Sequence, residues 1–233
     1  MIDFSDKTLI LLSIITGSIL LIELLYHLFI FSRLSFYSTK RTKPKSSENF
    51  NVSVIICANN EANNLAENIP LICTQDYPNF EVILVDDGSS DNTLNVLDTL
   101  KQKHSNLVVT YTNRIDLIKR GKKMALTMGL KAAKYDYVLL TDADCKPSSK
   151  NWIKEMVQAK NLLNKDIVLG ISPYQKRKGF LNKIIQFETA QTALHFLSFT
   201  LAKIPHMGLG RNMMYRKQLF FDISGFSSHN HIM

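Results

Sequence analysis

The chain has 233 residues, of which 45% are hydrophobic, and its formal net charge at pH 7 is +8. This length and composition allow one domain of ordinary size with an added segment, and they argue against a disordered chain. The cysteines Cys57, Cys73 and Cys145 form no closely spaced pair, which argues against a disulfide framework or a zinc site and fits a reducing compartment. The basic charge would suit nucleic acid, a membrane surface or a phosphorylated substrate. No nucleic-acid-binding signature is present, so we expect no nucleic-acid partner.

The first element is an almost unbroken apolar run from Thr8 to Phe31, which is long enough for a helix that crosses a bilayer. Basic residues are frequent directly after the run and rare before it, so the positive-inside rule predicts that everything after the run lies in the cytoplasm. The run lacks a basic start and a small-residue cleavage site, which argues against a removable signal peptide. We therefore expect a single transmembrane helix within residues 1–31, a basic linker over 32–50, and a domain over 51–233.

From Val52 onward, short apolar runs alternate with longer amphipathic stretches. Strands are predicted at 52–57, 80–85, 107–111, 137–141 and 167–170, and helices at about 62–73, 93–104, 122–133, 150–164 and 180–202. Ser90 or Asp91 is the expected cap of the second of these helices. Strands separated by helices imply right-handed crossovers. The predicted fold class is therefore α/β, with a mostly parallel sheet and flanking helices.

The stretch from Tyr137 to Cys145 is the most informative, because an apolar strand there ends in two carboxylates, Asp142 and Asp144. Positions i and i+2 of a strand point the same way, so these side chains would project together if extended geometry persists past Thr141. Two carboxylates this close repel each other unless a cation lies between them or one takes up a proton. Hard oxygen ligands at this spacing suit Mg²⁺ or Mn²⁺. Alone, the pair would fit an Asp-rich turn with Asp142 as a helix cap equally well.

Polar and acidic residues also follow two other predicted strands, at 59–61 and at Asp86-Asp87. In a parallel sheet the carboxyl ends of the strands lie at one edge, where ligands bind. This convergence favours a ligand site over a set of unrelated turns. An Asx-turn and helix cap is the alternative role for Asp86 and Asp87, and a solvated helix face is the alternative for Lys122. The glycine segments at 121–123 and 208–210 complete neither a P-loop nor a dinucleotide fingerprint.

Four segments, Val52 to Glu61, Val85 to Asp91, Lys122 and the triplet at 142–144, together resemble family 2 glycosyltransferases with the GT-A fold. The resemblance covers about residues 51–226. It implies a Rossmann-like nucleotide-binding fold and an inverting transfer of a sugar from a UDP- or GDP-linked donor to an acceptor hydroxyl of a glycan or lipid. It also implies a divalent cation, Mg²⁺ or Mn²⁺.

The resemblance implies roles for individual residues as well. The nucleotide-binding residues would be Ala58, Asn59, Glu61, Asp86, Asp87, Lys122 and Asp142. Among them, Asp87 would accept a hydrogen bond from the base with Asp86 supporting it, and Lys122 would lie near the phosphates. Asp142 would face the ribose or the metal, and Asp144 would bind the metal at the diphosphate. The donor–acceptor pocket would be lined by Gly208, Gly210, Arg211 and Asn212.

The sequence departs from the family pattern after Gly225-Phe226, where a carboxylate motif would supply the general base for the acceptor hydroxyl. No acidic residue follows Asp222. We therefore expect a chain truncated at its C-terminus, with the base beyond Met233, that binds donor and metal but has lost most transfer activity. The alternative is an inactive, membrane-tethered module that binds nucleotide sugars or serves as a scaffold. A nucleotidyltransferase on a similar sheet is less favoured, because the turn after the first strand lacks a glycine-rich, basic loop.

Three further features each allow two interpretations. Glu23 and His27, one helical turn apart, either mark an ion pathway or, as we favour, form a polar pair against another transmembrane helix. Trp152 is more consistent with the core than with a sugar platform. The apolar helix at 180–202, preceded by basic residues, lies either at the membrane interface or in the core.

Overall fold

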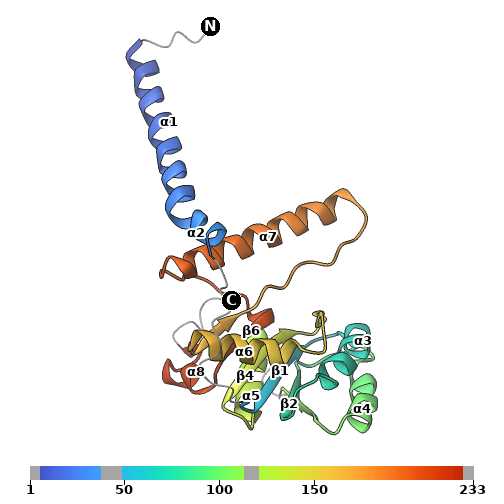
Figure 1. Ribbon diagram of the computed structural model, residues 1–233. Helices are drawn as coiled ribbons and strands as arrows, with labels where there is room; N and C mark the ends of the chain where they lie inside the picture. Colours follow the sequence, from blue (N-terminus) through green and yellow to red (C-terminus); the bar gives the residue numbers. More distant parts are fainter. Residues whose placement is uncertain (1–5, 38–48, 113–120, 228–233) are drawn as a thin grey trace. The chain divides into compact units, whose positions relative to one another are not determined.

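The computed structural model describes residues 6–37, 49–112 and 121–227 of the chain (Figure 1). Contacts within the chain divide it into two units, one of residues 1–41 and 173–208 and the other of residues 42–172 and 209–233. Most of the basic linker predicted over 32–50 lies outside the described residues. The two units are treated separately below.

The larger unit is built on a six-stranded sheet with the order β3-β2-β1-β4-β6-β5. Its strands are β1 (Val52–Ala58), β2 (Phe80–Asp86), β3 (Leu107–Tyr111), β4 (Tyr137–Asp142), β5 (Ile167–Leu169) and β6 (Met213–Arg216). Strands β1 to β4 are parallel, whereas β6 is antiparallel to both of its neighbours. The predicted mostly parallel α/β sheet is therefore confirmed, and β6 is a strand that the sequence pattern did not reveal.

Alternation along the strands divides the core between the two faces of this sheet. In β1, Val54 and Ile56 join the larger hydrophobic cluster, and Ile55 between them joins the smaller one. The larger cluster is covered by α3 (Ala62–Cys73), α4 (Thr93–Lys103) and α6 (Trp152–Leu163), and the smaller one by α5 (Lys122–Ala132). Both faces of the central strands are buried, which explains why these strands read as continuous apolar runs.

Helix α5 lies unusually close to the sheet at Gly129. A Cβ atom at this position would lie 2.6 Å from Cγ2 of Ile55 and 3.1 Å from Cγ2 of Val85, so only glycine fits. As the crossover between parallel strands, α5 begins at the carboxyl edge of the sheet and runs back toward the amino edge. Its first residue, Lys122, is thereby placed at the edge where the strands end.

The beginning of α4 differs from the prediction. The cap position is Asn92, and neither Ser90 nor Asp91 occupies it. Oδ1 of Asp91 nevertheless accepts a hydrogen bond from the backbone N–H of Thr93 at 3.0 Å. The carboxylate thus accepts a hydrogen bond from a backbone N–H of the first helical turn, although Asp91 lies one residue before the cap position.

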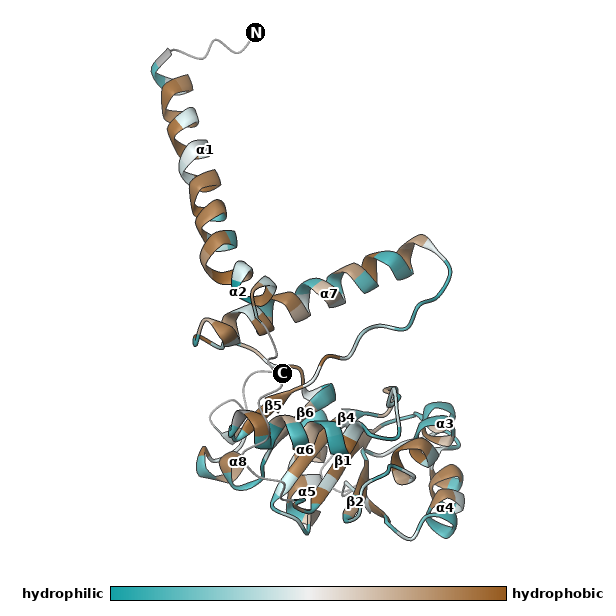
Figure 2. Cartoon of the chain, in the orientation of Figure 1, coloured by the Kyte–Doolittle hydropathy of each residue, from teal (hydrophilic) through white to brown (hydrophobic). Residues whose placement is uncertain are grey.

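The smaller unit contains the apolar N-terminal helix and one later helix. The N-terminal helix runs through α1 (Asp6–Tyr26), a π-helical turn η1 (His27–Phe31) and α2 (Ser32–Ser35), and the later helix is α7 (Phe180–Leu201). Among the residues that the structure describes, one helix of 29 residues, Lys7–Ser35, is long and apolar enough to cross a membrane. Figure 2 shows α1 hydrophobic along most of its length. Nδ1 of His27 lies 2.9 Å from the backbone oxygen of Glu23, so the side chain of His27 contacts the main chain of Glu23.

Candidate functional site

The carboxyl ends of three parallel strands meet where β1 lies between β2 and β4. The register pairs Ala58 with Asp86 on one side of β1 and Cys57 with Asp142 on the other. The connection after β1 leads to β2 on one side and the connection after β4 leads to β5 on the other, which is where a parallel sheet opens a crevice. A cavity of about 290 Å³ lies there, lined by Cys57, Ala58, Asn59, Glu61, Asp87, Lys122, Ala125, Asp142, Ala143 and Asp144.

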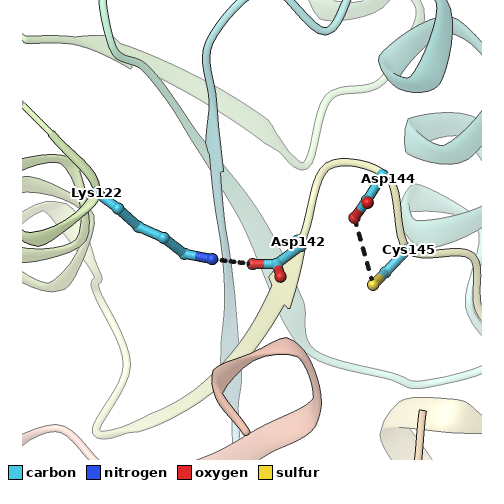
Figure 3. Close-up of polar contacts among 4 residues, drawn as sticks. All are labelled: Lys122, Asp142, Asp144 and Cys145. Carbon is cyan, nitrogen blue, oxygen red and sulfur yellow. Dashed lines mark hydrogen bonds and ion pairs between the residues drawn. The ribbon is translucent and has the colours of Figure 1, made fainter. Parts of the chain in front are cut away.

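The acidic end of this cavity follows β4. One oxygen each of Asp142 and Asp144 and the sulfur of Cys145 lie within 4.8 Å of one another. Nζ of Lys122, from the start of α5, lies 2.6 Å from Oδ1 of Asp142 (Figure 3). Sγ of Cys145 donates a hydrogen bond to Oδ1 of Asp144 at 3.6 Å. The backbone N–H of Cys145 also donates to the backbone oxygen of Asp142 at 3.1 Å, which closes the turn between the carboxylates.

The donor set of this cluster fits a divalent cation. The carboxylates of Asp142 and Asp144 supply hard oxygen ligands, and the ammonium of Lys122 already places one positive charge against Asp142. Burial, followed by the charges of Asp144 and Asp142, raises the pKa of the Cys145 thiol to about 11. A thiol that is protonated at neutral pH is a poor ligand for a hard cation. Asp142 and Asp144 are therefore the residues that could hold Mg²⁺ or Mn²⁺ here.

The opposite end of the cavity is formed by two loops that are hydrogen-bonded together. Oδ1 of Asn60, a residue with φ of 58°, accepts hydrogen bonds from the backbone N–H groups of Ser90 at 2.8 Å and Asp91 at 3.2 Å. The backbone N–H of Asn60 in turn donates to Oγ of Ser89 at 2.8 Å. The turn after β1 and the loop after β2 consequently behave as one structural piece.

Asp86 and Asp87 occupy different environments although they are adjacent. Asp86 is 3% exposed, and its carboxylate accepts hydrogen bonds from the N–H and the hydroxyl of Ser89. It therefore supports the loop from below and does not line the cavity. Asp87 does line it, and its Oδ1 accepts a hydrogen bond from Oγ1 of Thr112 at 2.9 Å. Nδ2 of Asn59 donates to the backbone oxygen of Asp87 at 2.8 Å, which orients the Asn59 side chain.

The residues of the predicted donor–acceptor segment are not among those that line the cavity. Gly208 belongs to the smaller unit, and Gly210, Arg211 and Asn212 form a 3₁₀ turn before β6. Oδ1 of Asn212 accepts a hydrogen bond from Nε1 of Trp152 at 3.0 Å, so this side chain ties α6 to the sheet. Nε of Arg211 is buried without a hydrogen-bond partner among the described residues. None of the three lines the 290 Å³ cavity.

Comparison with known families identifies this arrangement. Residues 53–223, which cover most of the chain and both ends of the cavity, match the family model of "Glycosyl transferase family 2". The chain belongs to glycosyl transferase family 2.

Several known proteins are similar in sequence to part of this family 2 glycosyltransferase. The poly-beta-1,6-N-acetyl-D-glucosamine synthase of Staphylococcus epidermidis is 34% identical over 94 residues, which cover 40% of this chain and 21% of that protein. Glycosyltransferase GlyG of Streptococcus pneumoniae is 31% identical over 119 residues, which cover 51% of this chain and 38% of that protein. The chain thus spans well under half the length of these relatives.

Solved structures support the GT-A-like fold. The mannosyltransferase PcManGT from Pyrobaculum calidifontis, in complex with GDP-Man and Mn²⁺, aligns with a TM-score of 0.67 and 23% identity. The alignment covers 88% of this chain and 55% of that one. TarS 1–349 of S. aureus, in complex with UDP-GlcNAc, aligns with a TM-score of 0.53 and 22% identity over 74% of this chain and 47% of that one.

Three residues in or beside the glycosyltransferase site were not singled out from the sequence. Cys145 was considered only as an unpaired cysteine, although its position beside Asp144 could have marked it. Asn60 was one of several polar residues in the turn after β1, and only its positive φ and its bonds to the loop after β2 reveal its role. Cys57 also lines the cavity, and burial raises the pKa of its thiol to about 12.

Proposed function

We propose that this glycosyltransferase binds a nucleoside diphosphate sugar, UDP- or GDP-linked, in the cavity at the carboxyl ends of β1, β2 and β4. The sugar is then moved, with inversion, to an acceptor hydroxyl of a glycan or lipid at the cytoplasmic face of the membrane. The observation that carries this proposal is the convergence of Asp87, Lys122, Asp142 and Asp144 on one cavity. Inversion and the class of acceptor are supported by the sequence resemblance to the family.

The two ends of the cavity suit the two ends of such a donor. The carboxylate of Asp87, oriented by Thr112, can accept a hydrogen bond from the nucleobase, and the neighbouring turn with Asn59 and Glu61 can pack on the nucleoside. The diphosphate would then lie toward Asp144. Complexes of fold relatives with GDP-Man and with UDP-GlcNAc support both nucleotides as candidates.

Charge on the departing nucleoside diphosphate is the main obstacle that the site must overcome. A Mg²⁺ or Mn²⁺ ion held by Asp142 and Asp144 would supply Lewis-acid stabilisation of that charge. Lys122 contributes a second cation from the protein itself. Its side chain is 69% exposed, so the ammonium can exchange Asp142 for a phosphate oxygen with little reorganisation. The carboxylate of Asp144 accepts a hydrogen bond from the thiol of Cys145.

The membrane context rests on α1. Its apolar side chains are exposed along the whole helix, and the basic residues after it favour an orientation with the N-terminus outside. We propose a single-pass anchor with the catalytic unit in the cytoplasm. A thiol-reactive probe that cannot cross the membrane should then label Lys7→Cys in intact cells and leave Lys131→Cys unlabelled.

Titration calorimetry of the detergent-solubilised chain tests donor binding. UDP-GlcNAc and GDP-mannose are titrated with and without Mn²⁺, and we expect binding of one of them that depends on Mn²⁺. The variant Asp144→Asn should abolish the Mn²⁺ dependence. Binding that is indifferent to Mn²⁺, or the absence of binding with both donors, would count against the proposal. Where product forms, the anomeric configuration read by proton NMR tests inversion.

A further inference from the structure

The first half of α7 exposes a stripe of large apolar side chains. Phe180 is 78% exposed, Leu181 68%, Ile184 44% and Phe187 64%. Phe180, Ile184 and Phe187 follow the i, i+4, i+7 spacing that places side chains on one face of a helix. A contiguous exposed patch of this kind marks a surface that meets something apolar.

The opposite face of the same half-helix carries the polar side chains of Asn182, which is buried, and Gln186, which is half-buried. Asn182 is 8% exposed, its Oδ1 accepts a hydrogen bond from the backbone N–H of Arg177 at 2.7 Å, and its Nδ2 donates to the backbone oxygen of Gln175 at 3.2 Å. Gln186 also donates to Oδ1 of Asn182. A helix on a water-facing surface buries its apolar stripe and exposes its polar one. Here the arrangement is reversed, so the medium outside Phe180 and Phe187 is expected to be apolar.

Basic residues surround this apolar stripe. Lys176, Arg177 and Lys178 directly precede the helix, Lys183 lies within its first turns, and Glu188 is the acidic residue among them. An apolar stripe bordered by lysine and arginine is typical of a helix that lies in the plane of a membrane with anionic headgroups. A second copy of the chain is a poorer partner, because it would bring the same positive charges together.

The second half of α7 packs against the end of the N-terminal helix within the same unit. The ring centroids of Phe199 and Tyr26 are 5.8 Å apart, and those of His195 and Phe31 are 5.0 Å apart. Tyr26 and Phe31 lie in the last part of the apolar run, and aromatic residues near the end of a span are typical of the headgroup level. On the proposed anchoring by α1, the second half of α7 therefore lies near the level of the bilayer surface, and the first half continues the same helix from there.

We propose that the first half of α7, with the basic segment before it, is a second membrane-binding element that inserts Phe180, Leu181, Ile184 and Phe187 among the headgroups of anionic lipids. The element lies in the plane of the membrane, with the basic side chains at the phosphate level. Anchoring by α1 and insertion by α7 are separate attachments of the same unit.

Depth-dependent fluorescence quenching in the full-length chain tests this element. The chain contains one tryptophan, Trp152, so Phe187→Trp adds one reporter on α7. Val108→Trp, at an exposed position of β3 in the larger unit, is the matched control. Both variants are reconstituted into phosphatidylcholine vesicles with and without phosphatidylglycerol, in which part of the phosphatidylcholine is brominated high on the acyl chain.

We expect the Phe187→Trp emission to be quenched about twofold more than that of Val108→Trp in vesicles containing phosphatidylglycerol. Replacing Lys176, Arg177 and Lys178 together with glutamate should remove most of that difference. Equal quenching of the two variants would overturn the proposal. The proposal would also be overturned if the Phe187→Trp emission were insensitive to brominated lipid and became more shielded from solvent as the protein-to-lipid ratio rises. That result identifies a second copy as the partner. Flotation of the chain with vesicles reports the α1 anchor separately, so failure of the anchor and failure of α7 insertion can be told apart.

Discussion

Removal of Lys122 should change cation binding and nucleotide binding in opposite directions. Nζ of Lys122 lies 2.6 Å from Asp142, but the two side chains are 69% and 31% exposed, so solvent screens the pair. Exposed ion pairs are worth about 0.2–1 kcal/mol. A cation that binds Asp142 must displace this ammonium, so Lys122→Ala should tighten Mn²⁺ binding about 1.4- to 5-fold in the absence of nucleotide. Loss of a positive charge beside the phosphates should weaken Mn²⁺-dependent donor binding about tenfold or more.

Electron paramagnetic resonance of free Mn²⁺ measures the first effect, and calorimetry with UDP-GlcNAc or GDP-mannose at saturating Mn²⁺ measures the second. Lys131→Ala is the matched control, because it removes the same charge from an exposed position in the last turn of the same helix. It should leave both affinities unchanged. Weaker Mn²⁺ binding by Lys122→Ala without nucleotide would refute the reasoning, because it would mean that the ammonium supports the cation site instead of competing with it.

Three further predictions concern residues in and beside this cavity. Asp144→Asn should weaken Mn²⁺ binding about tenfold or more, since affinity for hard cations depends on the number of charged ligands, and the same resonance titration checks this. Asp86→Asn should lower the free energy of unfolding by about 1–3 kcal/mol, because the buried side-chain NH₂ group of the asparagine would face the hydrogen-bond donors of Ser89. Asp87→Asn, by contrast, should weaken nucleotide binding and leave thermal unfolding nearly unchanged. Because its pKa is about 11, the thiol of Cys145 should react with iodoacetamide about a hundredfold more slowly at pH 8 than an ordinary thiol. The rate should rise about tenfold per pH unit up to about pH 10 and begin to level off near pH 11. Mass spectrometry of the labelled peptide separates this site from the other cysteines.

The parallel part of the sheet was predictable because each of its central strands is buried on both faces. Such a strand must be apolar throughout, and a continuous run rich in valine, isoleucine and leucine between polar turns is easily seen in a sequence. Strand β6, with only four residues (Met213–Arg216), carries no such signal. Its pairing with β4 and β5 depends on tertiary contacts that bring residues more than 40 positions apart together, as in the pair of Val168 with Met214.

Within the site, the sequence located the acidic clusters but did not separate the functions of their members. Asp86 and Asp87 belong to one motif in the sequence, yet alternation at the end of β2 places one in the interior below the loop and the other on the cavity wall. Asn212 was assigned to a ligand pocket on the basis of its motif. Its side chain holds Trp152, a partner 60 positions away that no local pattern could indicate.

The two ends of the cavity are built independently, and this has a consequence for how the enzyme can vary. The proposed nucleoside end consists of two loops joined by Asn60, whereas the proposed cation end depends on the turn after β4 and on Lys122 at the start of α5. Between the two ends lies β1, which is rigidly paired on both sides. A substitution in the loop after β2 can therefore alter the choice of nucleobase without moving Asp142 or Asp144. On the proposed donor placement, such an arrangement would allow one scaffold to keep a fixed diphosphate-binding end while the nucleoside end adapts to a different donor.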